Sequence, residues 1–165
     1  MAKEKIIIVD KNDEIIGSKE IGTLDQSDIY RVSALWIQNS KGEILLTQKS
    51  FNKKNNTGKW GLAVTGIINE GESYESKIIK EAEEQINLKN CQFKKTYLHF
   101  HDGESKHFTQ WFFALVDREI EEFVIEKKKV KKIKWFTKEQ LIQDLNNTPN
   151  KFEKIILKCV NFFNK

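Results

Sequence analysis

Residues 66–88, GIINEGESYESKIIKEAEEQINL, constrain the fold more than any other part of the chain. Gly66 is followed by five residues and Glu72, and then by seven residues and a stretch dense in carboxylates, Lys80 to Leu88. A glycine lets the backbone make a turn or a close approach that other residues resist. The spacing of the glycine, the glutamate and the acidic helix is suited to holding divalent cations.

The helix is expected to begin near Ser73, a suitable N-cap, and to end near Asn87, which tolerates the left-handed conformation of a helix end. Residues three and four apart share a helix face, so Glu81, Glu84 and Gln85 should project together. A neighbouring apolar stripe suited to a core contains Ile78, Ile79, Ala82 and Ile86.

Bunched oxygen acceptors of this kind repel one another unless a cation lies among them. Hard oxygen ligands suit Mg²⁺ or Mn²⁺, which keep several waters and bind substrate phosphates. The alternative is a solvated charged face on which Lys77 and Lys80 pair with the glutamates, since 32% of the residues are charged. The spacing of Gly66 and Glu72 favours the cation site.

The composition is that of a globular protein. Among 165 residues there are 4 Trp, 3 Tyr and 11 Phe, and no repeat or linker interrupts the chain, so we expect a single domain over residues 1–165. Cys91 and Cys159 make no disulfide framework, and the N-terminus does not resemble a signal peptide, which predicts a cytoplasmic protein. A net charge of +4 permits anionic substrates without requiring nucleic acid, and no apolar run predicts a membrane partner.

Hydrophobic periodicity and turn residues predict an α/β (α+β) order of strands and helices. Strands are expected at 5–9, 14–18, 29–38, 43–48, 60–68, 93–101, 108–116 and 133–136; helices are expected at 73–87, 137–146 and 152–163, and a polar loop at 50–59.

The acidic stretch resembles the Nudix box, G-x5-E-x7-R-E-U-x-E-E-x-G-U, in which U is a bulky aliphatic residue. The strict matches are Gly66, Glu72, Glu81, Glu84 and Leu88, and Ala82 fits loosely. Lys80, Gln85 and Asn87 depart from the pattern. The resemblance implies an α/β/α sandwich with a mixed sheet, a box helix and C-terminal helices.

The flanking segments are similar to the branch that includes type I isopentenyl-diphosphate isomerase. That enzyme needs a cysteine five residues after the tryptophan of this strand and a histidine two residues further on. Counted from Trp60, these places hold Thr65 and Ile67, and Tyr30 replaces an upstream histidine. A threonine hydroxyl is far less acidic than a thiol, so isomerase chemistry is not expected.

The Nudix resemblance instead implies a metal-dependent hydrolase that cleaves a diphosphate linkage in a nucleoside diphosphate-X type substrate. By this resemblance, Glu81 is the central metal ligand and helps to activate water, and Glu84 holds a second cation. The backbone carbonyl of Thr65 and the side chain of Gln85 complete the ligand set for Mg²⁺ or Mn²⁺. Glu72 braces the loop by pairing with Lys80, which takes the place of the family's arginine.

Two departures support a second hypothesis, a degenerate Nudix domain that binds a nucleotide or a partner without cleaving it. Gln85 contributes no charge where the family has a second strong metal ligand. The segment 127–134, KKKVKKIK, is basic where some relatives are acidic. This lysine run reads as a solvated loop and strand edge, or as a surface that binds phosphates or nucleic acid. His99, His101 and His107 read mainly as packing or surface residues, with a metal site or the lining of a substrate pocket as the alternative.

Overall fold

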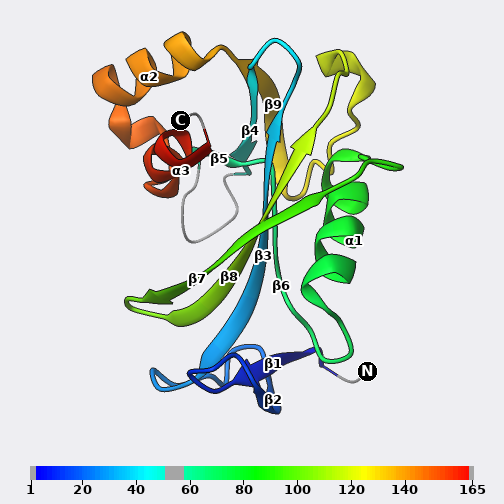
Figure 1. Ribbon diagram of the computed structural model, residues 1–165, viewed down its shortest axis with the longest axis vertical. Coiled ribbons are helices and arrows are strands. Elements are labelled where there is room, and N and C mark those ends of the chain that lie inside the picture. Colours follow the sequence, from blue (N-terminus) through cyan, green and yellow to red (C-terminus); the bar gives the residue numbers. More distant parts are fainter. Residues whose placement is uncertain (1–2, 51–57, 164–165) are drawn as a thin grey trace.

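The computed structural model describes residues 3–50 and 58–163, and in this part of the chain the strands form one nine-stranded mixed sheet (Figure 1). The strands are β1 Lys5–Val9, β2 Ile15–Glu20, β3 Ile29–Gln38, β4 Ile44–Lys49, β5 Trp60–Leu62, β6 Val64–Ile67, β7 Lys94–Asp102, β8 Lys106–Leu115 and β9 Val130–Phe136. β3 and β8 pair in parallel, whereas the other pairs of named strands are antiparallel.

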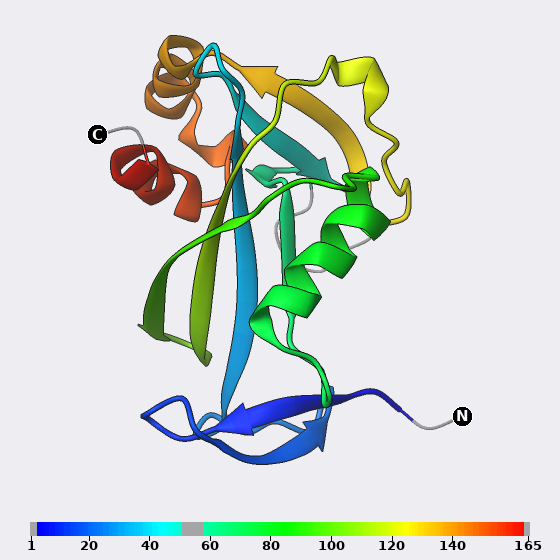
Figure 2. The same cartoon turned by 45° about the vertical axis from the view of Figure 1, so that its right-hand side comes forward.

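Helices cover both faces of the sheet, with α1 (Tyr74–Ile86) on one side and α2 (Lys138–Asn147) with α3 (Ile155–Phe163) on the other (Figures 1 and 2). Two 3₁₀ turns, Ile120–Glu122 and Pro149–Lys151, lie in the connections. The predicted α/β/α sandwich with a mixed sheet is therefore confirmed. No helix in the described ranges is long and apolar enough to cross a membrane.

The alternation of side chains along β3 explains why the sheet has two cores. Successive residues of a strand point to opposite faces. Leu35 and Ile37 join the core beneath α1, while Ala34 and Trp36 join the core beneath α2 and α3. Because β3 is buried on both faces over most of its length, it forms the central strand on which both helical layers rest.

The strand predicted at 60–68 is in fact two strands that change partner at Ala63. Leu62 at the end of β5 pairs with Leu46 of β4, whereas Val64 at the start of β6 pairs with Leu35 of β3. β3 and β4 share only the Gln38–Ile44 register pair and then diverge. The chain therefore crosses from one to the other and leads β6 directly into the box.

Helix α1 has the predicted ends. The Ser73 side chain accepts a hydrogen bond from the Ser76 N–H, and Asn87 adopts a left-handed conformation with φ 56° and ψ 38°. The predicted apolar stripe is wrong at Ile79, which is 56% exposed. The buried face is rotated away from Ile79 and includes Lys77, Glu81 and Gln85, so polar side chains lie against the sheet.

The remaining boundaries differ modestly from the predictions. β9 begins at Val130 rather than at residue 133, because it pairs with β4 as far as Lys49. The last helix begins at Ile155 rather than at Phe152, whose backbone instead bridges Trp60. Of the predicted loop 50–59, residues 51–57 lie outside the described residues.

Candidate active site

Gly66 of β6 allows the strand and helix α1 to approach closely. A Cβ atom at this position would lie 2.8 Å from Cγ of Glu81 and 2.9 Å from Cε of Lys77. Both distances are shorter than side chains tolerate, so any larger residue would displace one of the two stems. The glycine of the motif thus provides the space in which a glutamate and a lysine of α1 lie side by side.

Glu72 braces the loop between β6 and α1. Its Oε2 accepts a hydrogen bond from the Asn69 N–H at 2.9 Å and lies 3.3 Å from Nζ of Lys77, while its Oε1 lies 3.5 Å from Nζ of Lys80. Burial opposes ionisation of Glu72, but the Asn69 N–H and the two ammonium groups outweigh it and lower the pKa of this carboxyl. The expected contact with Lys80 is present, although the Lys80 side chain is half exposed.

Lys77 is the residue that sequence reasoning underestimated. Its Nζ lies 3.2 Å from Oε1 of Glu81, in addition to its contact with Glu72. Lys77 and Glu81 are the only charged residues in the buried part of the described chain, with exposures of 6% and 7%. The i, i+4 spacing of the two residues signalled this pairing, but the pairing had been expected on a solvated face.

Gln85 occupies the space between the two oxygens that were expected to bind a cation. Its Nε2 donates hydrogen bonds to Oε2 of Glu81 at 2.7 Å and to the backbone carbonyl of Thr65 at 3.0 Å. Gln85 is itself 6% exposed. The Glu81 carboxylate is consequently bound by Lys77 at one oxygen and by Gln85 at the other.

A lysine of the basic run also reaches this carboxylate. Lys129 lies in the turn before β9, and its Nζ is 3.9 Å from Oε2 of Glu81 and 3.8 Å from Glu126. The Glu126 N–H donates to the carbonyl of Gln85 at 2.9 Å, which attaches this turn to the C-terminal end of α1. Part of the segment 127–134 therefore faces the box, while Lys131, Lys132 and Lys134 are exposed on β9.

Glu84 and Lys80 lie on the outer side of the same helix. Both are exposed and, together with Ser76, Ile79 and Glu83, line a shallow hollow. The carboxylate of Glu72 and then that of Glu84 raise the pKa of Lys80. The structure thus brings Thr65, Gly66, Glu72, Glu81 and Gln85 together, and leaves Glu84 at the solvent edge of this group.

The positions that would carry isomerase chemistry do not resemble an acid–base pair. Ile67 is apolar and 40% exposed. Thr65 takes part in the box through its backbone carbonyl, which accepts a hydrogen bond from Gln85. The thiol of Cys159 lies in the core beneath α3, where burial raises its pKa to about 12.

Two other features lie away from the box. The rings of His101 and His107 are 4.8 Å apart at the β7–β8 hairpin, and His107 stacks on Tyr30 at 5.0 Å.

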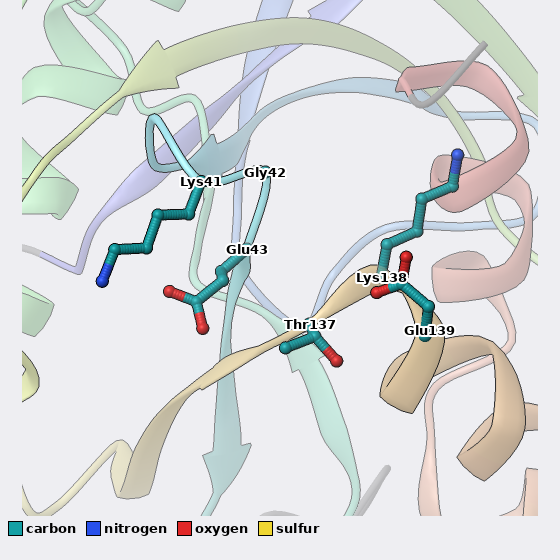
Figure 3. Close-up of a pocket in the computed structure, with 6 residues that line it drawn as sticks. All are labelled: Lys41, Gly42, Glu43, Thr137, Lys138 and Glu139. Atoms are coloured by element: carbon teal, nitrogen blue, oxygen red, sulfur yellow. The ribbon is translucent and has the colours of Figure 1, made fainter.

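A surface hollow of about 380 Å³ lies where the β3–β4 turn meets the start of α2 (Figure 3). It is lined by Lys41, Gly42, Glu43, Thr137, Lys138 and Glu139. Its lining carries both signs of charge and selects no ligand class.

The oxygens of Glu81 and Thr65 fit a cation, and Glu84 lies at the solvent edge of the same group. Oxygen atoms of Glu81 and Thr65 both accept hydrogen bonds from the amide nitrogen of Gln85. Rotation of the amide group would present its oxygen to a cation instead. Glu81 is the only carboxylate there that is buried, and no group of three or more His, Cys, Asp or Glu side chains in the described ranges is arranged to hold a metal. A cation would replace the hydrogen bonds that Gln85 now makes.

A mixed sheet between helical layers, with a glycine-containing strand that leads into a glutamate-bearing helix, defines a Nudix-type domain. The NUDIX domain model matches residues 29–156, and the chain belongs to this family.

Among similar proteins, isopentenyl-diphosphate Delta-isomerase of Salmonella heidelberg is 27% identical over 103 residues, which are 61% of this chain and 56% of that enzyme. The match thus spans just over half the length of that relative. DR0079 of Deinococcus radiodurans has a TM-score of 0.79 at 19% identity, over 96% of this chain and 98% of that one. The NUDIX domain of Shewanella oneidensis NrtR, solved with ADP ribose, has a TM-score of 0.58 at 20% identity, over 68% and 75%.

Proposed function

We propose that this protein hydrolyses the diphosphate linkage of a nucleoside diphosphate-X type compound with the help of Mg²⁺ or Mn²⁺. The observation that supports this function best is the position of Glu81, a buried carboxylate beside the Thr65 carbonyl and the close-approach glycine Gly66. Family membership supports the same reaction, because the box carries the family's chemistry. Glu81, the Thr65 carbonyl and Gln85 would hold the cation, and Glu84 would hold a second one.

The chemistry needs charge neutralisation at phosphorus and a positioned water. A bound divalent cation supplies Lewis acidity and neutralises the diphosphate oxygens. The carboxylate of Glu81 would orient a water molecule and accept its proton. Lys77 holds that carboxylate and is itself held by Glu72. Lys80 is half exposed beside the box and would attract the anionic substrate.

The substrate class rests on chemistry and on one structural relative. The positive side chains around the box favour an anionic linkage, and the NrtR domain binds ADP ribose, a nucleoside diphosphate joined to a sugar. We therefore place nucleoside diphosphate compounds first in any test panel. The group attached to the second phosphate stays open.

A second function is favoured by a specific observation. Gln85 donates to both expected ligand oxygens, as it would in a Nudix domain that binds a nucleotide or partner without cleaving it. Such a domain would use the same surface and the same lysines.

A screen of diphosphate compounds separates the two functions. The purified chain is incubated with nucleoside diphosphates, nucleoside diphosphate sugars and isopentenyl diphosphate, each with Mg²⁺ or Mn²⁺, and phosphate-containing products are quantified. Hydrolysis of at least one nucleoside diphosphate compound supports the enzyme. Binding by calorimetry without turnover across the panel supports the binding domain instead.

A further inference from the structure

The ammonium group of Lys77 lies between two carboxylates, and in the described ranges it is the only buried cation beside them. It is 3.3 Å from Oε2 of Glu72 and 3.2 Å from Oε1 of Glu81. The side chains of Lys77, Glu81 and Glu72 are 7%, 10% and 17% exposed. Opposite charges this close attract strongly when water is largely excluded. Lys77 is therefore the buried counter-charge of both glutamates.

The fold is shaped around this lysine. Gly66 leaves the space that the Lys77 stem fills, since a Cβ atom there would lie 2.9 Å from Cε and 3.2 Å from Cγ of Lys77. The box motif leaves position 77 unspecified, so the buried lysine is a property of this chain rather than of the pattern. A lysine is seldom buried unless it is paired, and here the pairing is with two residues that the motif requires.

The charges around the box give a free divalent cation no net attraction. Glu72 and Glu81 contribute two negative charges, and Lys77, Lys80 and Lys129 place three positive charges within 4 Å of their oxygens. Glu126, 3.8 Å from Lys129, adds a third negative charge, so these six side chains have no net charge. The remaining oxygen of Glu81 is already bound by the amide of Gln85. A cation at Glu81 would have to displace the Lys77 ammonium group from one oxygen or the Gln85 amide from the other.

We infer that Lys77 is a built-in counter-cation, which holds Glu72 and Glu81 together in place of one divalent metal ion. The box of this protein keeps its structure without metal, and its affinity for a free divalent cation is low. Metal then enters the site chiefly together with an anionic diphosphate, whose charge offsets that of the lysines. The inference concerns the free protein, so it holds whether the bound compound is cleaved or only bound.

The test compares the parent chain with Lys77→Met, which keeps the length of the side chain and removes its charge. Mn²⁺ binding is titrated by electron paramagnetic resonance without substrate, and Tm is measured in chelator and in Mn²⁺. The parent should bind Mn²⁺ weakly and have the same Tm in both buffers. Lys77→Met should melt lower in chelator, recover in Mn²⁺ and bind Mn²⁺ about 10- to 100-fold more tightly, a range typical of groups that adjust metal ligands.

Lys80→Met is the matched control, because Lys80 contacts Glu72 from the same helix but is half exposed. It should leave Mn²⁺ affinity close to that of the parent. Equal Mn²⁺ affinity in the parent and Lys77→Met would overturn the inference. If Lys77→Met does not fold in either buffer, the result rests on the parent chain. Weak Mn²⁺ binding by the parent supports the inference, and a parent Tm that rises with Mn²⁺ overturns it. No arm uses substrate, so failure of the proposed hydrolysis is a separate result.

Discussion

Glu81 is the residue on which the proposed chemistry depends, since it is the buried carboxylate shared by Lys77, Gln85 and Lys129. Glu81→Gln keeps the shape of the side chain and removes its charge. We expect turnover in the Mg²⁺ assay to fall by about a hundredfold or more, with an unchanged circular dichroism spectrum. Glu83→Gln, an exposed change on the same helix, should keep full activity. Parent-like turnover in Glu81→Gln would place the reaction elsewhere.

Gln85 permits a prediction in the opposite direction. Gln85→Glu replaces a donor to Glu81 and Thr65 by a second carboxylate at i, i+4 spacing. In chelator the variant should lose about 1 kcal/mol or more, since two hydrogen bonds are broken and like charges face each other. Mg²⁺ or Mn²⁺ should stabilise it more than the parent, and turnover at low metal concentration should rise.

A closely matched control for this change exists on the other side of the sheet. In α2, Gln140 donates to Asp144 four residues later at 2.8 Å, on an exposed surface. Gln140→Glu creates the same type of carboxylate pair but has no backbone carbonyl facing it. Mg²⁺ or Mn²⁺ should therefore raise the Tm of this variant no more than that of the parent. Identical metal titrations of Tm for Gln85→Glu and the parent would mean that Glu81 and Gln85 do not share a cation.

At the scale of the element, Asn87 ends α1 in a left-handed conformation, with its N–H bonded to the carbonyls of Ala82 and Glu83. The Nudix pattern has glycine here, and asparagine is the next most tolerant residue. Asn87→Gly should be close to neutral, whereas Asn87→Ala should lower the free energy of unfolding by about 1–2 kcal/mol, because alanine is strained at positive φ. Urea unfolding of the two variants measures the difference; equal stability would show that the cap is not required.

The elements also show which parts of the fold the sequence could predict. The limits of α1 were predictable because Ser73 and Asn87 are local signals. The break at Ala63 was not, because it depends on the divergence of β3 and β4, which are distant partners in the chain. The same applies within the site: the motif identified Glu72 and Glu81, but only the rotation of α1 against β6 shows that Lys77 is buried between them.

At the scale of the whole molecule, the β7–β8 hairpin adds a pH dependence that is separate from the box. His107 at the start of β8 stacks between Tyr30 and His101, and its Nδ1 is buried without a hydrogen-bond partner in the described structure. Burial, and then the neighbouring His101 and His99, lower the pKa of His107 from 6.5 to about 4. The folded protein therefore resists a proton that the unfolded chain accepts.

The sign follows from proton uptake. Between pH 6.5 and about 4 the unfolded state binds more protons at this position, so stability falls as the pH falls through that interval. His107→Phe keeps an aromatic ring and removes the titration, and it should abolish about 1–2 kcal/mol of this loss, after allowance for solvent screening at a half-buried ring. Exposed His99 provides the comparison, since His99→Phe removes only the smallest of the three causes of the shift and should reduce the pH dependence far less than His107→Phe. Urea unfolding of the three proteins at pH 7, 5.5 and 4 measures the effect, and parallel curves for His107→Phe and the parent would show that the acid sensitivity arises from other groups.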